Sequence, residues 1–507
     1  MIHLAILILV LGIAQQAQSG EAITLTKLEQ DLIMVHEELK DPTIFNRRTC
    51  ATYIENHALS LFQNGANKYL PDSEEDKTNL LDSAQRIARS LFEFRVSLLE
   101  IFKKFDKNDD VEKTCRNSIF RALRYSRFIE EMLMEWHFNK TGMPTTPEIL
   151  SGKEPFLMVN GNKHKLTLYS GDILVVRGRF FVSATIARIS DEEGQFSHSA
   201  IIYIDDKKQV WVLESLIEKG LIAVPWIEWV KHEPVRVLVL RHQDKNSANQ
   251  VANWLFNWIM WRKNHGMDPV PYDFNMNFHD SGELSCSELV RFAYAEGTNG
   301  KVIIPKYSSS VNKLSNKELF NDLGINEMEI YSPSDYEIDP SLRIIAEWKD
   351  YSKTYGTRIQ DAILTSVFSW MTKMNYELTY KGFTQSMGEL YWQILRPMGI
   401  GQQMVPINMT RGFFNTILAL NSVTGVLEDN LRRVKNRNGQ NKEWGLDYKT
   451  MLINLEEIRK NDCKEYLSIR NNKSNNYFLE ESPLSKEELL LHQFLNIPSE
   501  AGDCQEY

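Results

Sequence analysis

The sequence has little that would support metal chemistry or nucleic-acid binding. Its 507 residues include only five cysteines, with no Cys-x-x-Cys pair and no His-Glu-x-x-His motif, so neither a structural zinc site nor a zinc-hydrolase centre is supported. The formal net charge is −9, and charges of both signs are mixed along the chain. This balance lacks the basic surface that attracts nucleic acid or an anionic membrane. We therefore expect no metal, no organic cofactor and no nucleic-acid partner.

Long apolar runs are also lacking. The run from Leu4 to Ile13 is too short to span a bilayer core of about 30 Å. Ala17-Gln-Ser19 before Gly20 has the small residues of a cleavage site. Residues 1–19 therefore predict a signal peptide and an exported protein, periplasmic or secreted, with an uncleaved N-terminal anchor as the alternative. Because residues 413–427 contain several Asn, Ser and Thr side chains, we expect a buried helix there and no integral membrane span in the mature chain.

The positions of the cysteines agree with export. Cys50 and Cys115 precede Cys286, whereas Cys463 and Cys504 follow it. Pairing within each flanking segment predicts the disulfides Cys50–Cys115 and Cys463–Cys504. Cys286 is then left free, and an odd cysteine in an exported protein is a candidate reactive thiol.

Two helical regions flank a central region. In residues 20–150, apolar residues at three-to-four spacing predict four antiparallel helices. Helical periodicity returns in residues 341–507, and neither flank carries a chemistry of its own, so support, lid and partner surface stay open as roles. The predicted helices are Leu25–Leu39, Tyr53–Phe62, Leu80–Phe105 and Ile119–Phe138 in the first flank, and Ile344–Trp348, Ile359–Met371, Met387–Leu395 and Phe413–Leu427 in the second.

Residues 151–340 have a different pattern. Short β-branched or apolar runs alternate there with Gly, Asp and Lys, and two helices, 180–188 and 247–261, lie between them. This pattern predicts an α+β domain in which the helix that carries Cys286 packs across an antiparallel sheet. The predicted strands are Phe156–Val159, Leu166–Leu168, Ile173–Val176, Ser199–Ile204, Val210–Leu213, Leu221–Val224 and Val235–Leu240.

Cys286 stands at the start of a predicted helix. Ser285, followed three residues later by Glu288, forms a capping-box pattern with Ser285 as the N-cap. In the first helical turn, unpaired N–H groups and the helix dipole stabilise a thiolate and lower its pKa. A small buried apolar residue beside an ordinary cap is the simpler interpretation of Cys286 alone. A catalytic interpretation therefore needs a partner base.

His198 is the best candidate for that base. Two β-rich runs flank a polar turn, which is a hairpin signal. If residues 205–207 form the loop, Ile204 pairs with Lys208 and His198 lies directly opposite Glu214, with Cβ atoms about 5 Å apart. The carboxylate would then hold one ring nitrogen and leave the other free. A two-residue loop would put the two side chains on opposite faces, and a strand histidine without a catalytic role is the simpler interpretation of His198 alone.

His279 and Asp280 form the rival pair, because they lie close before Cys286 in the sequence. They stand in a polar loop with no strand to fix them, so we rank them second. Tyr272 or Ser183 could line the cleft. A backbone N–H near Cys286 would serve as one oxyanion donor, and the second donor is not assigned.

Five short motifs in the central region follow one another in a characteristic order. They are Ser170-Gly-Asp-Ile-Leu-Val-Val176, Phe196-Ser-His-Ser-Ala-Ile-Ile-Tyr203, Leu213-Glu-Ser215, Pro271-Tyr-Asp-Phe-Asn275 and Cys286-Ser-Glu-Leu-Val290. This order resembles the permuted papain-like amidases of the YiiX/YaeF type. That family is the circularly permuted branch of the NlpC-type cysteine peptidases and is related to the lecithin:retinol acyltransferases. The resemblance covers about residues 155–345.

The resemblance implies a circularly permuted papain-like (NlpC-type) catalytic domain at 151–340, between helical domains at 20–150 and 341–507. Carried over by position, Cys286 would be the nucleophile, His198 the base and Glu214 the residue that orients it. Two departures concern substrate fit or local packing more than the triad. Ser285 stands where the family often has tyrosine, and Asn277 stands where an acidic residue is expected.

The implied activity is that of an exported cysteine hydrolase, an amidase or peptidase acting through a thioester intermediate. Its expected partner is a peptide-like substrate of the cell envelope. An acyl-lipid hydrolase or acyltransferase of the lecithin:retinol acyltransferase type is one alternative. A non-catalytic binding module with an inert thiol is the other. The oligomeric state is not predicted.

Overall fold

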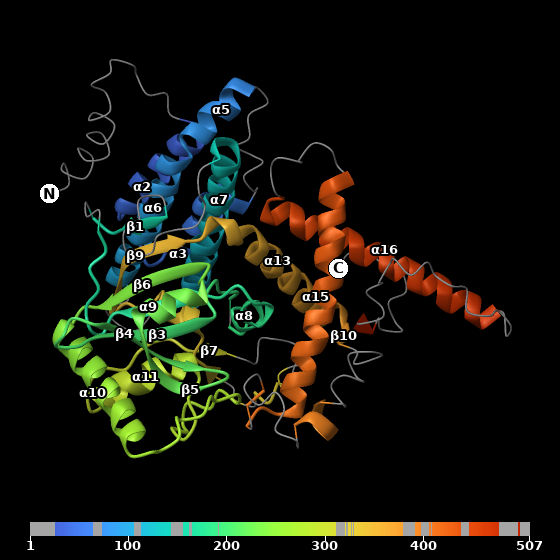
Figure 1. The fold of residues 1–507 in the computed structure, drawn as a ribbon. Helices are drawn as coiled ribbons and strands as arrows, with labels where there is room; N and C mark the ends of the chain where they lie inside the picture. Colours follow the sequence, from blue (N-terminus) through green and yellow to red (C-terminus); the bar gives the residue numbers. More distant parts are fainter. Residues whose placement is uncertain are drawn as a thin grey trace.

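The computed structural model shows helical groups on two sides of a central sheet (Figure 1). The N-terminal helices (blue) lie beyond one end of the sheet, and the C-terminal helices (orange) lie beside it. The predicted signal peptide, residues 1–19, lies outside the described residues. The structure describes residues 26–63, 74–105, 113–142, 156–161, 165–190, 192–310, 320, 323–325, 327, 329–378, 391–396, 405–406, 408–437, 446–475 and 495–496.

The N-terminal helices follow the predicted apolar pattern. The second predicted helix is continuous but contains a π-helical segment, and the third is divided by a turn at Ser83. The disulfide Cys50–Cys115 is confirmed, with Cα atoms 5.5 Å apart. It joins the start of the second helix to the start of the last one. The elements are α2 (Lys27–Lys40), α3 (Cys50–Tyr53), η2 (Ile54–Ala58), α4 (Leu59–Gln63), α5 (Glu74–Asp82), α6 (Ala84–Phe105) and α7 (Lys113–Thr141).

Seven antiparallel strands form the central sheet, in the order β1-β9-β6-β2-β3-β4-β5. The predicted α+β architecture, with a mixed domain between two helical regions, is confirmed. Two small sheets lie outside it, β7 (Ser309–Ser310) with β8 (Glu329–Ile330) and β10 (Glu377–Leu378) with β11 (Leu495–Asn496). The strands of the central sheet are β1 (Leu157–Val159), β2 (Ile173–Arg177), β3 (His198–Ile204), β4 (Val210–Leu216), β5 (Gly220–Pro225), β6 (Arg236–His242) and β9 (Leu342–Lys349).

Two predictions of local structure are wrong. The helix expected at 344–348 is strand β9, paired with β6 on one side and β1 on the other. Because both faces of β9 are covered and its last four residues are all buried, its two-residue period is hidden in the sequence. The sheet therefore extends beyond residue 340. The strand expected at 166–168 is absent. The carbonyl of Thr167 accepts a hydrogen bond from the side chain of Arg241, and not from the backbone of a neighbouring strand.

Helices cover both faces of the sheet. On one face, α10 (Lys245–Asn264) and α11 (Cys286–Gly297) pack against odd-numbered residues of β2 and β3 such as Val175 and Ile201. The predicted packing of the Cys286 helix across the sheet is thus confirmed. On the other face, the short helix α9 (Trp226–Trp229) covers even-numbered residues such as Val176 and Ile202. The short helix α8 (Phe181–Ile186) follows β2, close to the 180–188 prediction.

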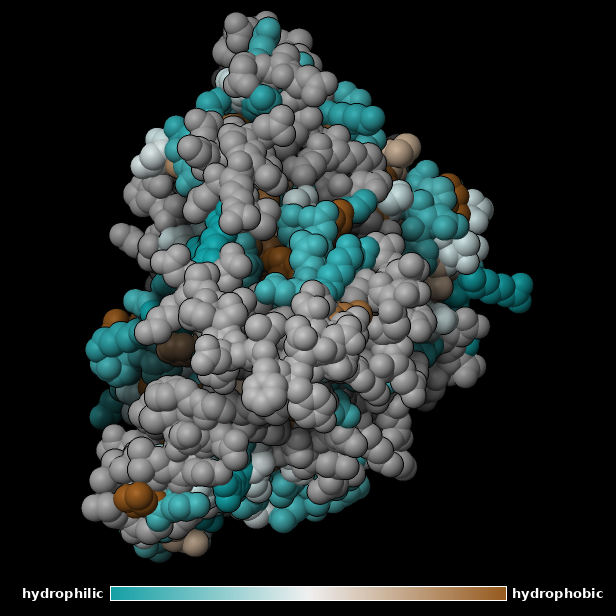
Figure 2. Space-filling view, turned by 90° about the vertical axis from the view of Figure 1, so that its right-hand side faces the viewer, coloured by the Kyte–Doolittle hydropathy of each residue, from teal (hydrophilic) through white to brown (hydrophobic). Residues whose placement is uncertain are grey.

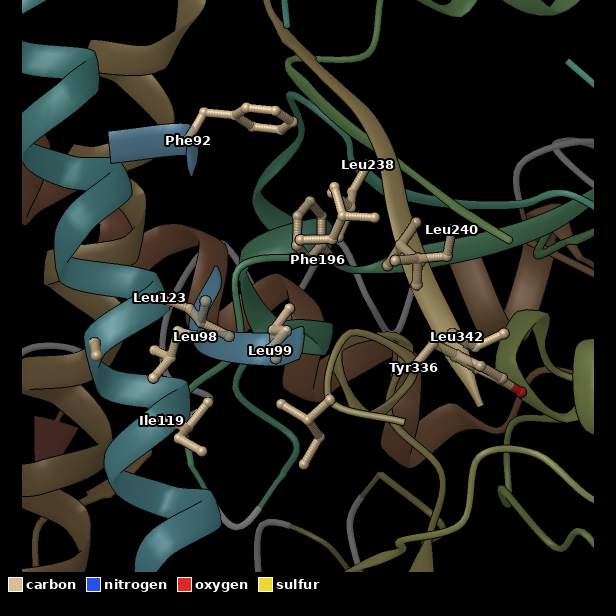
Figure 3. Packing of buried hydrophobic residues seen from close by; sticks show 14 of the residues in the cluster. Phe92, Leu98, Leu99, Ile119, Leu123, Phe196, Leu238, Leu240, Tyr336 and Leu342 are labelled. Carbon is tan, nitrogen blue, oxygen red and sulfur yellow. The ribbon is translucent and has the colours of Figure 1, made fainter. Parts of the chain in front are cut away.

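The N-terminal helices share one apolar core with the sheet. Figure 3 shows Phe92 and Leu99 of α6 and Leu123 of α7 near Phe196 and Leu238 of the central domain. Removing this much apolar surface from water is the main force that joins the two regions.

Buried ion pairs add directional contacts between α7 and the elements around it. Arg236 of β6 pairs with Glu131 of α7 at 2.5 Å and with Asp361, in the helix at residues 351–374, at 3.2 Å. Arg127 of α7 pairs with Glu337 and with Glu347 of β9. Each of these charges is almost fully buried, so each needs its partner to offset the loss of hydration.

The C-terminal region is helical around a second apolar core. The helices predicted at 359–371 and 413–427 are confirmed within α13 (Tyr351–Met374) and α15 (Arg411–Arg437). The same region also contains α16 (Tyr448–Asn475) and the π-helical η8 (Tyr391–Leu395). Of the helix predicted at 387–395, residues 387–390 lie outside the described residues.

A second disulfide bears on export. Cys463 is disulfide-bonded, and its predicted partner Cys504 lies outside the described residues. Within the described ranges, no helix is both long and apolar enough to cross a bilayer.

Figure 2, which views the molecule from the side of the C-terminal helices, shows mostly hydrophilic residues with scattered hydrophobic ones among those that it colours.

Candidate active site

Cys286 begins α11, as the capping pattern predicts. Ser285 is the N-cap, and its hydroxyl accepts a hydrogen bond from the backbone N–H of Glu288 at 3.4 Å. The carboxylate of Glu288 in turn accepts from the backbone N–H of Ser285 at 2.8 Å. Cys286 is buried and is the free cysteine among the described residues. The thiol thus lies at the positive end of a helix dipole, which favours the thiolate.

Two serines of the sheet fix the start of α11. Ser199 of β3 donates from its hydroxyl to the carbonyl of Cys286 at 3.0 Å. Ser215 of β4 donates to the carbonyl of Leu284 at 2.6 Å. The two strands also carry His198 and Glu214, so the same hairpin that holds the start of α11 supplies both candidate partners of Cys286.

The structure brings His198 and Glu214 together, with Nε2 of the ring 2.8 Å from Oε2 of the carboxylate. The predicted register is nevertheless wrong. Ile204 pairs with Val210, not with Lys208, so the loop has two more residues than expected. Lys208 adopts the left-handed conformation in this loop, with φ 67°. Since the register differs by two residues, both side chains remain on one face of the hairpin and meet diagonally.

His198 also hydrogen-bonds to Cys286. With Nε2 occupied by Glu214, Nδ1 is the ring nitrogen left for the thiol. Burial lowers the pKa of His198, but the hydrogen bonds from its ring to Cys286 and Glu214 outweigh burial and raise the pKa to about 10. Burial raises the pKa of Cys286, but the hydrogen bond and charge of His198 outweigh it, so the pKa of the thiol is lowered. Both shifts favour a thiolate beside an imidazolium over a neutral thiol beside a neutral imidazole.

Tyr272 also interacts with the thiol. Its side chain is buried, and its hydroxyl hydrogen-bonds to Cys286. Burial and the charge of the thiolate raise the pKa of Tyr272 well above its usual value, so the phenol stays protonated and can donate. Asn408, from the C-terminal region, donates to the carbonyl of Tyr272 at 2.7 Å, so that region helps to position this loop.

A cavity of about 750 Å³ opens onto Cys286 and His198. Tyr272 and Ser183 line it, as predicted from the sequence. Apolar side chains form most of its wall, and Arg179, Lys219 and His232 lie among them. The aliphatic and aromatic residues of the wall are Val176, Phe180, Val182, Ile186, Leu216, Ile217, Trp229 and Pro234.

Comparison with known families agrees with this geometry. Residues 167–318 match the model of a family described as permuted papain-like amidase enzyme, YaeF/YiiX, C92 family. The central domain is of the permuted papain-like type. No curated protein matches the chain. The match includes the strands and helix that carry Cys286, His198 and Glu214, and it leaves both helical flanks outside. This family supports a cysteine peptidase or amidase in general.

The alternative pair, His279 and Asp280, lies away from the thiol. His279 and Asp280 are exposed and do not line the cavity. The backbone N–H of His279 donates to the side chain of Asn277, and Asp280 accepts from the backbone N–H of Gly282. Both interactions are those of a local turn. The structure therefore does not bring this pair to the thiol.

Trp229 lies next to the site, and the sequence does not predict this position. Trp229 of α9 donates from Nε1 to Oε2 of Glu214 at 3.2 Å. Nothing in the local sequence around Trp229 points to Glu214, because the contact depends on how α9 crosses the hairpin. As for metals, the described part of the chain contains no cluster of three His, Cys, Asp or Glu side chains placed to hold an ion.

Proposed function

We propose that the protein is an exported cysteine hydrolase that cleaves amide bonds in peptide-like substrates of the cell envelope. Cys286 is the nucleophile, His198 the general base and acid, and Glu214 the residue that orients the ring. One observation carries the proposal. A free thiol at a capped helix N-terminus hydrogen-bonds to an imidazole whose other nitrogen is held by a buried carboxylate. The family match of the central domain supports it.

The chemistry follows from these positions. The Cys286 thiolate attacks the carbonyl carbon, and the C–O π electrons move onto the oxygen. Backbone N–H groups in the first turn of α11 hold this oxyanion, and we assign the Tyr272 hydroxyl as the second donor. Protonated His198 gives its proton to the leaving amine as the C–N bond breaks. Water then attacks the thioester, His198 removes its proton, and the carboxylic acid and thiolate are released.

Glu214 supports each of these steps without reacting. Its carboxylate keeps the ring of His198 oriented with Nδ1 toward the thiol, and its charge stabilises the imidazolium. The disulfides Cys50–Cys115 and that of Cys463 are compatible with export, since such bonds persist in oxidising compartments.

A second function is favoured by one specific observation, the apolar wall of the cavity. Side chains such as Val182, Ile186 and Ile217 would suit an aliphatic chain better than a polar peptide. An acyl-lipid hydrolase or acyltransferase would use the same thioester chemistry. The two functions differ in the substrate consumed, so they can be separated directly.

The first experiment is labelling of the intact protein with an electrophilic thiol probe at neutral pH. We expect Cys286 to be labelled rapidly, and substitution His198→Ala to slow labelling by a factor of about 10² or more, because the thiolate loses its imidazolium partner. His279→Ala is the matched control, since this histidine is exposed and away from the cavity. A folded wild type that stays unlabelled would favour the non-catalytic binding module.

Mass spectrometry then identifies the substrate class. Muropeptides and lipid extracts are each incubated with the wild type and with Cys286→Ala. New free amine and carboxyl ends in muropeptides, present only with the wild type, support the amidase. Release or transfer of fatty acyl groups, with muropeptides unchanged, supports the lipid alternative.

A further inference from the structure

Two buried carboxyl groups beside the nucleophile have no part in the mechanism described above. Asp273 follows Tyr272 directly and is 2% exposed, and Glu288 stands two residues after Cys286 and is 3% exposed. Both belong to the short motifs that the sequence shows at 271–275 and 286–290. Buried carboxylates are costly unless each oxygen has a partner.

The hydrogen bonds of this pair leave one oxygen unexplained. Asp273 accepts from the backbone N–H groups of Asn275 and Asn277, each at 2.7 Å. Glu288 uses Oε2 to accept from the backbone N–H of Ser285. Its Oε1 is buried and receives no hydrogen bond from the described protein groups. The Asp273 carboxyl acts on Glu288 through its charge and can form a side-chain hydrogen bond with it once one of the two groups is protonated. Two carboxyl groups can share a hydrogen bond only when one of them carries a proton.

The surroundings favour such a shared proton. Burial, followed by the negative charge of Asp273, raises the pKa of Glu288 to about 8. Two adjacent carboxyl groups in a buried site cannot readily both ionise. The other titratable or charged groups near the pair are Cys286 and Tyr272 beside it, His198 beyond the thiol, Glu283 and Asp280 on the preceding loop, and Arg291 one turn along α11, whose guanidinium lies over the ring of Tyr331.

We propose that Asp273 and Glu288 hold one proton between them and act as positioning residues for the nucleophile. Asp273 orders the loop that carries Tyr272, and Glu288 completes the cap that carries Cys286. The shared proton joins these two segments, so the thiol and the Tyr272 hydroxyl keep a fixed position relative to each other. Loss of the proton leaves two negative charges side by side, and their repulsion separates the two segments.

The pair therefore sets an alkaline limit below that of His198. The pKa of His198 is raised to about 10, whereas the pKa of Glu288 is raised to about 8. The test compares Glu288→Gln with the wild type, because a glutamine amide donates to Asp273 and still accepts from Ser285 but does not titrate. The rate of Cys286 alkylation by iodoacetamide is measured from pH 5 to 10.5, together with hydrolysis of whichever substrate the wild type cleaves.

We expect the wild-type alkylation profile to change slope near pH 8 and the Glu288→Gln profile to lack that change. The alkaline limb of hydrolysis should move upward by about two pH units. Glu296→Gln on the same helix is the matched control, since this side chain is exposed, and it should keep the wild-type profile. Identical profiles for wild type and Glu288→Gln, both folded, would overturn the proposal.

A second measurement covers the case in which Glu288→Gln does not fold. Infrared titration of the wild type should show a protonated buried carboxyl that disappears near pH 8 and is missing in Asp273→Asn. If no carboxyl proton titrates in that range, the shared proton is refuted. The hydrolysis readout rests on the proposed function, but alkylation and infrared titration do not. A protein that shows the break near pH 8 without hydrolysing any substrate would contradict the proposed function alone.

Discussion

Trp229 and His198 both hydrogen-bond to the same oxygen of Glu214, at 3.2 Å and 2.8 Å respectively. The indole comes from α9, outside the hairpin that carries the other two residues. A carboxylate held by two donors keeps its orientation when the ring changes protonation state. The position of the His198 ring therefore depends on a helix that lies outside the hairpin.

Substitution Trp229→Phe tests this dependence. Removing the indole N–H deletes a hydrogen bond to a charged group, which contributes about 1.5–3 kcal/mol. We expect kcat/KM to fall by about tenfold or more, measured with the substrate identified by mass spectrometry. Trp226→Phe is the matched control, because this stacked neighbour is also buried and its Nε1 has no hydrogen-bond partner among the described residues. An equal loss in both variants would indicate a packing effect instead.

Glu214→Gln should change both the rate and the titration of His198. The pKa of His198 is raised to about 10 by hydrogen bonds to Cys286 and Glu214, so removing the Glu214 charge should lower it. Because the folded pKa lies above the ordinary value of 6.5, the imidazolium stabilises the fold fully below pH 6.5, and this contribution is lost as the pH rises through about 10.

The measurement for Glu214→Gln is NMR titration of the His198 ring, with kcat followed in parallel. We expect a lower titration midpoint and a fall in kcat of about 10²-fold or more. A midpoint and kcat equal to those of the wild type would show that Glu214 has no influence on the base.

The buried ion pair between Arg236 and Glu131 should contribute to the stability of the whole chain. Glu131→Met leaves the guanidinium with Asp361 as its carboxylate partner, and breaking a buried pair in this way costs about 3–5 kcal/mol. The double variant Glu131→Met with Arg236→Met should lose less than the sum of the two single variants, as measured by urea unfolding. Additive losses would mean that the two side chains do not interact energetically.

The disulfide Cys50–Cys115 should stabilise the N-terminal helices without affecting the thiol. It spans 65 residues, and closing a loop of this length limits the unfolded chain. Replacing both cysteines by serine should lower the free energy of unfolding by about 2–5 kcal/mol. In native conditions the labelling rate of Cys286 should not change. A large change in that rate would show that the N-terminal helices control the active site.

Much of the candidate site could be predicted because its signals are local. The cap formed by Ser285 and Glu288 depends on residues three apart in the chain, and its geometry is that of any capped helix. That His198 and Glu214 share a face depends only on whether the hairpin loop is odd or even in length. The error of two residues in register thus left their contact intact.

Contacts between distant segments could not be predicted in the same way. Residues 344–348 form a strand because β6 and β1 lie on either side, and covering both faces removed the alternation that marks a strand. The hydrogen bond from Trp229 to Glu214 and the charge interaction between Asp273 and Glu288 join segments whose order in the chain carries no sign of their contact.

The sequence by itself determined the amphipathic helices, the capped and unpaired cysteine, and the face on which its base would lie, because helix and strand periods act over a few residues. Only the tertiary structure decided that residues 342–349 form a strand, where the cavity lies, and which groups the buried carboxyl groups contact. Burial and hydrogen bonding between distant segments choose those contacts once the whole chain has folded.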